Sequence, residues 1–498
     1  MTLPGHFLFA PSHRIHFIGI GGIGMSGIAE ILLTMGYAVS GSDLRKTSAT
    51  DRLASLGATI YTGHTAANTA DSDVVVTSSA VPAENPEVSE ARARKIPVIQ
   101  RAEMLAELMR LKYGIAVAGM HGKTTTTSMI AAVLGAGGGE GNLDPTVVVG
   151  GRVDALGSNA RLGSSQYLVA EADESDRSFL KLSPVLAVVT NLDREHMDCY
   201  RDMTDVEGSF VEFMDRVPFY GATTACIDNA LLRGVLERVH RRVYTYGESE
   251  GSDFRLQGLE SIHISDARPF DKLRAGYGAP NAVGHWQFEV SCRGTVLGPF
   301  TLHGPGRHNV LNATAAIAIG VQLGLSPEGI AAGLASFRGV DRRFQVRGTM
   351  RGVTVVDDYG HHPTEILATL RAARDAGYTR VHVLFQPHRY TRTRDLQPEF
   401  ARAFADADTL QVLDIYAASE QPIPGVDAPS LVDAIRRTGT ISGSVQYADS
   451  MAAGVEALAQ TAREGDVILT LGAGNVSQAS VLLLEALGAK DGADTSYV

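Results

Sequence analysis

The sequence predicts an α/β protein built from about three domains. The chain has 498 residues, which corresponds to roughly three domains at about 150 residues each. Short β-branched runs alternate with glycine-rich or acidic turns and amphipathic helices, an order typical of parallel sheets covered by helices. Two glycine-rich turns, at 19–24 and 119–122, each join a predicted strand to a predicted helix.

The alternation restarts near Tyr113 and again near Gly339, which sets the expected domain boundaries. The expected domains are 1–112, 113–338 and 339–498. Strands are predicted at 14–20, 37–43, 74–80, 96–100, 113–119, 167–173, 186–193, 353–359, 380–386, 409–415 and 466–471.

The predicted helices include 23–35, which Gly36 ends by adopting the left-handed conformation, and the alanine-rich segment 308–323. Two segments, 135–144 and 264–284, have the polar, glycine-rich or proline-rich composition of surface insertions. We assign no role to either insertion.

The composition excludes several classes of protein. Lys and Arg number 44 against 55 Asp and Glu, so the formal charge of −11 provides no broad basic surface for nucleic acid or anionic lipid. The cysteines at 199, 226 and 292 form neither a disulfide framework nor a CxxC metal motif. No secretion signal or bilayer-spanning apolar run stands out. We expect a cytoplasmic protein with no nucleic-acid or membrane partner.

The glycine turn at 19–24 fits the pattern G-x-G-x-x-G directly after a strand. Glycines there let backbone N–H groups approach a diphosphate, and the helix start adds partial positive charge. Asp43, at the end of the next predicted strand, is placed to accept hydrogen bonds from a ribose or a base. Two alternatives stay open: a turn needed only for packing, and an NAD-dependent dehydrogenase. The second nucleotide loop and the lack of an evident hydride-transfer site argue against the dehydrogenase.

The second turn, GMHGKT at 119–124, also joins a strand to a helix. Lys123 is suited to β- and γ-phosphate oxygens, the Thr124 hydroxyl to Mg²⁺, and the backbone amides to phosphate. Val117 stands where the general P-loop pattern has its first glycine, so that pattern fails at one position. A lysine and a run of hydroxyls are poor core residues, which favours phosphate binding over packing.

Acidic residues and a histidine follow the next two predicted strands. The segment 171–174 (EADE) ends one strand, and 191–198, which contains His196, ends the other. Sheets of this class place ligands at the carboxyl ends of their strands, carboxylates suit Mg²⁺, and histidine suits a second divalent ion. Any one residue could be a solvated loop charge, but together they predict a metal–phosphate site.

Two polar segments follow strands in the third region, DDYGHHP at 357–363 and QPHRYTRTR at 386–394. Arginine side chains bind carboxylates through two parallel hydrogen bonds, so this cationic loop in an acidic protein predicts a small anionic substrate. Salt bridges to Asp395 and Glu399 are the alternative role for these arginines.

The motifs in this order resemble the Mur ligases, and most closely their alanine-adding branch, over nearly the whole chain. They are HFIGIGGIGMSGIAE, GMHGKTTTT, EADESDRSFL, TNLDREHMDCY, HNVLNATAA, GVDRRFQ, DDYGHHPTEI and FQPHRYTRTRDL. The resemblance implies a Rossmann-like N-terminal domain, a central P-loop ATPase-type domain and a Rossmann-like C-terminal domain. It also implies the reaction: ATP phosphorylates the lactyl carboxylate of UDP-N-acetylmuramic acid, and L-alanine then displaces phosphate to form an amide of the peptidoglycan precursor.

The resemblance further implies the residues at each site. UDP-sugar residues are Gly19, Gly21, Gly22, Gly24, Met25, Ser26, Ser42, Asp43, Ser78 and Ser79. ATP residues are Gly119, His121, Gly122, Lys123, Thr124, Thr125, His308, Asn309, Asn312, Arg343 and Asp358. Amino-acid residues are Tyr359, His361, Arg389 and Arg392. Two Mg²⁺ ions are implied, with Thr124 and Glu171 on the first and His196 on the second. The expected catalytic residues are Lys123, His196, Arg343 and His361.

The chain departs from the family pattern at two places. Met120 stands where threonine is usual, which is tolerable because the backbone surrounds the phosphate. Many Mur ligases carry a carbamylated lysine after the metal histidine, whereas 208–211 contains no lysine, so we predict no carbamate. The alternative activity is that of the recycling ligase, which joins a murein peptide to the same sugar nucleotide. A monomer and a homodimer both stay open.

Overall fold

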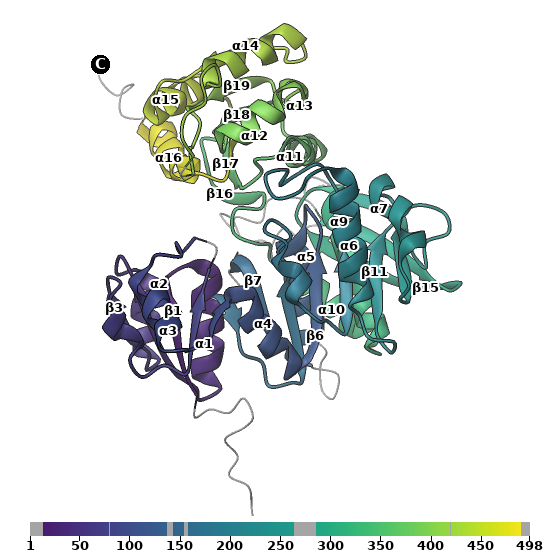
Figure 1. Cartoon of the computed structure of the whole chain (residues 1–498). Helices are drawn as coiled ribbons and strands as arrows, with labels where there is room; N and C mark the ends of the chain where they lie inside the picture. Colours follow the sequence, from purple (N-terminus) through teal and green to yellow (C-terminus); the bar gives the residue numbers. More distant parts are fainter. Residues whose placement is uncertain are drawn as a thin grey trace, which may run out of the picture. The chain divides into compact units, whose positions relative to one another are not determined.

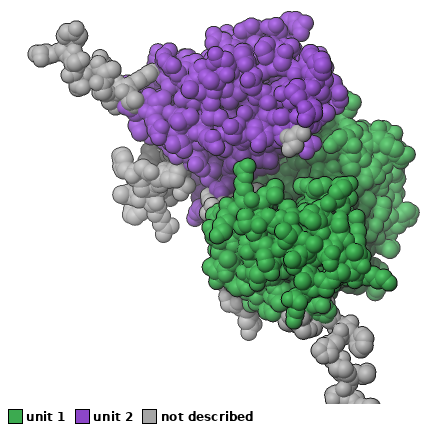
Figure 2. All heavy atoms as spheres, turned by 60° about the vertical axis from the view of Figure 1, so that its left-hand side comes forward, with its two compact units in different colours: residues 1–258, 288–300, 311–337 green, residues 259–287, 301–310, 338–498 purple. Residues whose placement is uncertain are grey.

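The computed structural model describes residues 13–78, 80–136, 143–153, 158–262, 285–418 and 420–489. Within these residues, three sheets form the framework, and their strands alternate with helices along the chain (Figure 1). The chain divides into two compact units, which are coloured separately in Figure 2. Unit 1 comprises 1–258, 288–300 and 311–337, and unit 2 comprises 259–287, 301–310 and 338–498.

The N-terminal sheet is parallel and has the strand order β3-β2-β1-β4-β5. Its strands are β1 (Arg14–Ile18), β2 (Ala38–Asp43), β3 (Thr59–Thr62), β4 (Val74–Thr77) and β5 (Val98–Gln100). Its helices are α1 (Ile23–Thr34), α2 (Ser48–Ser55), α3 (Pro86–Ala93) and α4 (Arg101–Arg110), with the 3₁₀ turn η1 (Ala66–Thr69). Because strand order reverses at β1, the carboxyl end of β1 is where this class of sheet places ligands.

The central sheet has the order β15-β14-β13-β12-β11-β10-β6-β9-β7-β8. Its strands are β6 (Tyr113–Ala118), β7 (Thr146–Val153), β8 (Ser158–Arg161), β9 (Tyr167–Glu171), β10 (Leu186–Val189), β11 (Ala222–Cys226), β12 (Val243–Gly247), β13 (Phe254–Ile262), β14 (His285–Cys292) and β15 (Thr295–His303). Its helices are α5 (Lys123–Gly135), α6 (Met203–Asp215), α7 (Ala230–Val235), α9 (Arg307–Gln322) and α10 (Pro327–Ser336), with 3₁₀ turns η4 (Ser178–Lys181) and η5 (Leu236–Arg238). The buried strand β6 lies between β9 and β10 and is parallel to both.

The C-terminal sheet has the order β16-β17-β21-β18-β19-β20, and only β16 is antiparallel to its neighbour among these described strands. Its strands are β16 (Gln345–Met350), β17 (Val353–Asp358), β18 (Val381–Phe385), β19 (Thr409–Val412), β20 (Val445–Tyr447) and β21 (Val467–Leu471). Its helices are α11 (Pro363–Asp375), α12 (Tyr390–Asp395), α13 (Gln397–Arg402), α14 (Ala428–Thr438), α15 (Met451–Thr461) and α16 (Ala479–Ala489), with the 3₁₀ turn η7 (Asn475–Gln478).

Apolar residues on both faces of β21 explain why helices cover this sheet on both sides. Val467 and Leu469 pack into one buried cluster, whereas Ile468 packs into the other. Successive side chains of a strand point to opposite faces, so a strand apolar at every position must be covered twice. Residues of α11 and α14 fill the first cluster, and residues of α15 and α16 fill the second.

The predicted α/β fold class is confirmed, and the predicted strands begin within two residues of the observed ones. Several predicted ends are wrong because the chain leaves the sheet earlier: the strand predicted to reach 193 ends at Val189, and the one predicted to reach 415 ends at Val412. Gly36 follows α1 with φ +90°, as predicted. The insertion at 264–284 and most of the one at 135–144 lie outside the described residues.

Helix length and polarity bear on membrane insertion. None of the helices in the described part of the chain is both long enough and apolar enough to cross a bilayer.

Candidate active site

The first glycine turn connects β1 to α1 and is anchored to the end of β2. Gly19 N donates to the carbonyl of Ser42 (2.8 Å), and Gly21 N donates to Asp43 Oδ2 (2.9 Å). The parallel register pairs Ile18 with Ser42, so the two strand ends lie side by side. The predicted UDP-sugar residues on these two segments are therefore brought together.

The start of α1 has features of an anion site. Gly22 occupies its N-cap without a side chain that caps the helix, and no acidic residue lies in the first turn. Unmet N–H groups at a helix start favour an anion. Met25 and Ser26 are buried in this turn. Ser78 follows β4 on the other side of β1, whereas Ser79 lies outside the described residues.

A buried carboxylate, Glu87 on α3, connects the elements behind this turn. The Ser42 hydroxyl donates to Glu87 Oε2 (2.6 Å), and the Asn68 amide donates to Oε1 (2.6 Å). His64 Nδ1 lies 3.1 Å from Oε2, and His16 Nε2 lies 3.6 Å from Oε1. Burial alone would raise the pKa of Glu87, but these neighbours outweigh it and lower the pKa to about 2.

The depressed pKa of Glu87 predicts a pH dependence of stability. A carboxylate whose pKa lies below its ordinary value of 4.5 stabilises the fold above that pH, and the contribution is lost as pH falls toward 2. We expect the free energy of unfolding to fall by about 3 kcal/mol over that interval on account of this group. Denaturant unfolding of the parent protein and of Glu87→Gln at several pH values measures it. Parallel pH profiles for the two proteins would contradict the assignment.

The second glycine turn follows β6, which lies between β9 and β10, the two strands that precede the acidic segments. β6 leads into this turn, β9 ends at Glu171, and β10 leads to the segment that contains His196. Gly122 takes φ +82° at the N-cap of α5, and the Asn312 side chain lies against it so closely that a methyl group would meet Asn312 Oδ1 at 2.8 Å. The predicted ATP residues Gly122 and Asn312 are therefore neighbours.

The Lys123 side chain is fixed in this turn by three hydrogen bonds. Its Nζ donates to the carbonyls of Gly119 (2.7 Å) and Met120 (3.2 Å) and to Glu174 Oε1 (2.8 Å). His196 Nε2 lies 3.3 Å from the same Glu174 oxygen. Burial alone would lower the pKa of Lys123 and of His196, but the nearby carboxylates outweigh it and raise both.

Glu174, which the sequence analysis named only as part of the segment 171–174, is the carboxylate that pairs with Lys123. The rule that ligands follow strand ends selects Glu171, whose Oε2 accepts from Gly150 N (2.8 Å). The chain turns after β9, and this turn brings the next acidic residues, Asp173 and Glu174, toward Lys123. The run of three acids within 171–174 was the available signal, but spacing alone does not say which of them faces the lysine.

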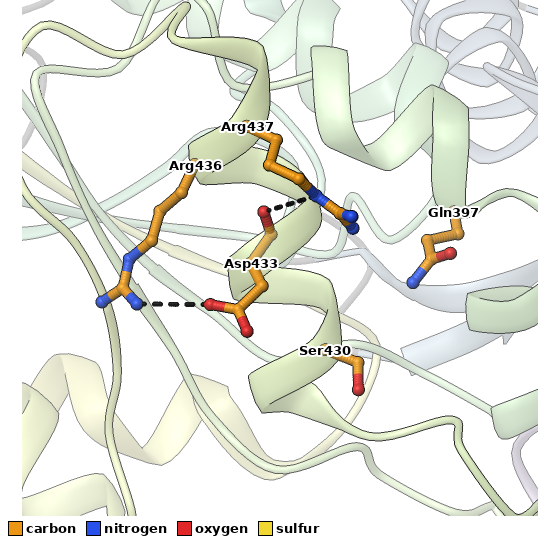
Figure 3. A pocket seen from close by; sticks show the side chains of 5 residues that line it. All are labelled: Gln397, Ser430, Asp433, Arg436 and Arg437. Atoms are coloured by element: carbon orange, nitrogen blue, oxygen red, sulfur yellow. Dashed lines mark hydrogen bonds and ion pairs between the residues drawn. The ribbon is translucent and has the colours of Figure 1, made fainter.

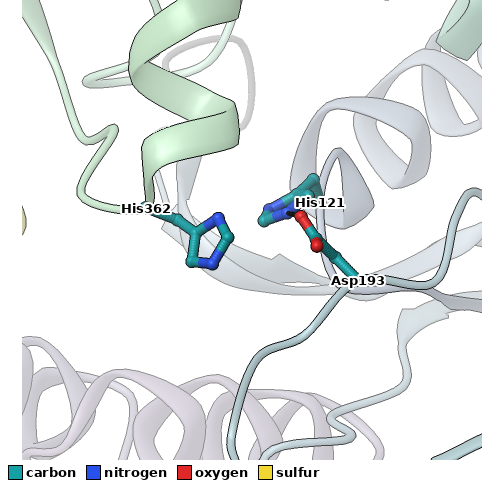
Figure 4. A group of neighbouring side chains, drawn as sticks. All are labelled: His121, Asp193 and His362. Carbon is teal, nitrogen blue, oxygen red and sulfur yellow. Dashed lines mark hydrogen bonds and ion pairs between the residues drawn. The ribbon is translucent and has the colours of Figure 1, made fainter. Parts of the chain in front are cut away.

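His121 pairs with the segment after β10, as Figure 4 shows. Its Nε2 lies 2.8 Å from Asp193 Oδ2, and its backbone N donates to Asn191 Oδ1 (2.9 Å). The Thr190 hydroxyl donates to the carbonyl of His121 (2.6 Å). These contacts fix the middle of the glycine turn to the end of β10. His362, also drawn there, belongs to unit 2 and is the N-cap of α11.

Four further predicted ATP residues lie at the starts of two helices. Thr124 and Thr125 lie in the first turn of α5, and no acidic residue opposes an anion there. His308 and Asn309 lie in the first turn of α9, where Asn309 Nδ2 donates to the carbonyl of Pro305 (2.9 Å). Their contacts with adenine stay a prediction.

Three of the predicted amino-acid residues gather around His388 in unit 2. The His361 ring lies 5.3 Å from that of Tyr359 and 5.5 Å from that of His388. Arg392 Nη1 lies 3.1 Å from His388 Nδ1, and Tyr416 stacks on the His388 ring at 5.7 Å. Burial, followed by the charges of His361 and the nearby arginines, lowers the pKa of His388 to about 3, which favours a neutral ring.

Arg389 begins the same loop in a strained conformation. Its φ is +70°, and its backbone N donates to the carbonyl of Tyr416 (2.8 Å). A non-glycine residue with positive φ costs free energy and occurs often at functional sites. A backbone hydrogen bond to Tyr416, which follows β19, therefore holds Arg389.

Asp358 and Arg343 occupy the start of the C-terminal sheet. Asp358 is buried and accepts hydrogen bonds from Phe344 N and Gly360 N, both at 2.7 Å. Arg343 Nη1 donates to Glu365 Oε1 (3.0 Å), and its guanidinium lies 5.4 Å from the Tyr359 ring centre. Asp358, the last residue of β17, thus fixes the backbone that leads into β16 and the turn after β17, and its predicted contact with ribose stays a prediction.

A separate pocket of about 550 Å³ lies beside α14 (Figure 3). Its lining residues are Gln397, Ser430, Asp433, Arg436 and Arg437. Arg436 pairs with Asp433 Oδ1 (3.4 Å), and Arg437 Nε donates to the Asp433 carbonyl (3.2 Å). None of these five residues was predicted to bind a substrate. The cationic groups already have partners, so the pocket has no evident connection to the chemistry above.

The geometry of the central sheet defines a class of protein. A buried strand runs into a glycine turn and a lysine at a helix start, between two acidic strand ends, which is the arrangement of P-loop nucleotide-binding proteins. Residues 14–113 match the Mur ligase family, catalytic domain; 117–320 match the Mur ligase middle domain; and 342–474 match the Mur ligase, glutamate ligase domain. The chain belongs to the Mur ligase family, as the motifs predict.

Individual relatives cover nearly the whole chain. The UDP-N-acetylmuramate–L-alanine ligase of Acidobacterium capsulatum is 66% identical over 480 residues, which are 96% of this chain and 99% of the relative. The solved UDP-N-acetylmuramate–alanine ligase of Thermotoga maritima is 29% identical with a TM-score of 0.72, covering 96% and 99%. A murein peptide ligase of Psychrobacter arcticus is 23% identical with a TM-score of 0.65, covering 96% and 99%, and shares the fold.

Proposed function

We propose that the chain is an ATP-dependent ligase that joins L-alanine to the lactyl carboxylate of UDP-N-acetylmuramic acid. The substrate carboxylate attacks the γ-phosphorus of ATP, ADP leaves, and the alanine amine displaces phosphate from the acyl phosphate. The observation that carries the proposal is Lys123, fixed at a helix start between two acidic strand ends. The relative that is 66% identical bears the alanine-adding name, whereas the murein peptide ligase is only 23% identical. Alanine is therefore favoured over a murein peptide as the acceptor.

The chain's own residues supply charge and position rather than a nucleophile. The group that attacks ATP is the substrate's own carboxylate, so no reactive serine or cysteine is required. Lys123 offsets the negative charge that gathers when a carboxylate approaches a triphosphate, and the amides at the start of α5 hold phosphate oxygens. The first glycine turn holds the UDP diphosphate, with Ser42 and Asp43 near the uridine.

The residues around Lys123 fit divalent cations. One oxygen of Glu174 is buried with no hydrogen-bond partner, and the His196 ring lies next to the other oxygen. Carboxylate oxygen and imidazole nitrogen are suitable ligands. Thr124 and Glu171 would hold one Mg²⁺, and His196 would hold a second. Bound there, Mg²⁺ would offset the charge of the phosphate oxygens.

The C-terminal part is proposed to receive the amino acid. Tyr359, His361, Arg389 and Arg392 are the proposed L-alanine residues, Arg343 the proposed phosphate contact and Asp358 the proposed ribose contact. We also propose domain boundaries after residues 112 and 338, where the alternation of strands and helices in the sequence restarts.

Phosphate release tests the function. Purified protein with UDP-N-acetylmuramic acid and Mg-ATP is assayed with each amino acid in turn and with a murein peptide. We expect release that depends on L-alanine together with the sugar nucleotide. Release that ignores L-alanine overturns the proposal, and release that requires the peptide favours the recycling ligase.

Arg389→Ala is expected mainly to raise the KM for L-alanine. A charge-assisted hydrogen bond to a carboxylate contributes about 1.5–3 kcal/mol, which corresponds to roughly a 10- to 100-fold change. Steady-state kinetics at saturating ATP and sugar nucleotide measure it. Arg394→Ala is the matched control, because Arg394 is exposed and pairs with Asp395 (2.7 Å). An unchanged KM would place the carboxylate contact elsewhere.

A further inference from the structure

Glu174 is a buried carboxylate whose two oxygens have different surroundings. Its side chain is fully buried. Its Oε1 lies 2.8 Å from Lys123 Nζ and 3.3 Å from His196 Nε2. Oε2 is equally buried and has no hydrogen-bond partner. The Tyr200 hydroxyl donates to the Glu174 carbonyl (2.6 Å), which fixes the backbone of this residue. A buried carboxylate oxygen that forms no hydrogen bond is costly and requires an explanation.

The position of Glu174 matches that of a cation ligand. Adjacent ligands of an octahedral ion with bonds of about 2.1 Å lie roughly 3 Å apart. The separation of 3.3 Å between Glu174 Oε1 and His196 Nε2 is compatible with two neighbouring ligands of one ion. Glu195 is also close, with Oε1 3.8 Å from His196 Nε2. A structural role as counter-ion of Lys123 accounts for one Glu174 oxygen but not for the second.

We propose that Glu174 is a divalent-cation ligand that acts together with His196. The inference rests on the proposed function, because it assigns a further residue to the same nucleotide site. In this structure Glu174 holds Lys123. Once it shares a cation with His196, its carboxylate is neutralised from a second side, and Lys123 Nζ becomes available to phosphate oxygens. Cation binding and release of the lysine are therefore coupled through one side chain.

Binding of Mn²⁺ to the full chain tests the proposal. The paramagnetic resonance signal of free Mn²⁺ is titrated with wild type, Glu174→Gln and Glu207→Gln, each with and without a non-hydrolysable ATP analogue. Glu207 is the matched control because it pairs with Arg238 on the surface (3.1 Å). We expect Glu174→Gln to weaken Mn²⁺ binding at least tenfold and Glu207→Gln to leave it unchanged. An unchanged Mn²⁺ titration for Glu174→Gln overturns the proposal and leaves Glu174 as a counter-ion only.

Two further measurements keep the outcomes distinct. Should Glu174→Gln fail to fold, Glu174→Asp retains the charge but shortens its reach, and the same weakening is expected; unaltered binding then overturns the proposal. If the wild type releases phosphate with L-alanine but Glu174→Gln binds Mn²⁺ normally, this inference is wrong and the proposed function stands. If Mn²⁺ binding requires Glu174 but phosphate release does not depend on L-alanine, the proposed function is wrong and this inference stands.

Discussion

Lys123→Ala is expected to lower phosphate release at least about 1000-fold. Lys123 is the cation fixed at the start of α5, and no neutral side chain offsets the charge of a triphosphate approached by a carboxylate. Binding of UDP-N-acetylmuramic acid is expected to persist, because its proposed residues lie on the N-terminal sheet. Isothermal titration with the sugar nucleotide and a phosphate-release assay measure the two effects separately.

A matched control for this substitution is Lys181→Ala. Lys181 lies on η4 near the surface, where its Nζ contacts Gln100 (2.6 Å) and Glu103 (3.2 Å). The substitution Lys181→Ala removes the same charge as Lys123→Ala but does not touch the glycine turn. Near-normal activity is therefore expected. If Lys123→Ala lost sugar-nucleotide binding together with turnover, the assignment of the two sites to separate sheets would be wrong.

The ion pair with Glu174 adds a stability effect to the same substitution. Removing one partner of a buried pair leaves the other charge uncompensated and costs about 3 kcal/mol. Lys123→Ala is therefore expected to unfold at lower denaturant concentration. The double variant Lys123→Ala/Glu174→Gln is expected to recover stability but not activity. Equal stability of the single and double variants would show that the pair contributes little to folding.

Gly119→Ala is the second change with a large expected effect. Gly119 has φ +131°, where a side chain is strained, and a methyl group would overlap the Thr190 hydroxyl and lie 3.1 Å from Asn191 N. The strained φ and the overlap with the Thr190 side chain act together, so a loss of about 3 kcal/mol or more is expected. ATP binding should fall with it, because the carbonyl of Gly119 also holds Lys123. Denaturant unfolding and nucleotide titration measure the two losses.

The control for Gly119→Ala is Gly135→Ala, at the last residue of α5. A methyl group there meets nothing within 4 Å, and alanine favours the helix over glycine by about 0.5–1 kcal/mol. This variant is expected to be as stable as the parent or slightly more so, with unchanged activity. Similar unfolding energies for the two variants would contradict the proposed strain at Gly119.

Several buried parallel strands were predictable because their residues are apolar on both faces, whereas the buried strand β11, which reads ATTAC, was not predicted. β10, which reads LAVV, is buried throughout, and such runs leave little choice of structure. The edge strand β5 was predicted, but the edge strands β3 and β20 were not, because they carry few buried apolar residues. β3, which reads TIYT, has mostly exposed positions, and β20 spans only Val445–Tyr447. Their strand conformation follows from pairing with a neighbour rather than from local sequence.

The glycine turns were predictable because each is a continuous motif between a strand and a helix. The contacts that complete the site join residues far apart in sequence. Lys123 meets Glu174 across 51 positions, and Ser42 meets Glu87 across 45. Spacing along the chain does not determine which of several acids reaches a lysine; the turn after β9 does. For this reason Glu171 was selected by its place at a strand end and Glu174 was not.

The contact between Lys123 and Glu174 also affects which anions the glycine turn retains. Glu174 is an intramolecular competitor that is present at a fixed, high effective concentration beside the ammonium group. A small anion such as sulfate contacts few groups at once and offers Lys123 little that it does not already have. A triphosphate gains contacts with several amides of the glycine turn at once and therefore displaces the competitor. The pair of Lys123 and Glu174 therefore favours ligands that form several contacts with the glycine turn at once over ligands that form only one or two.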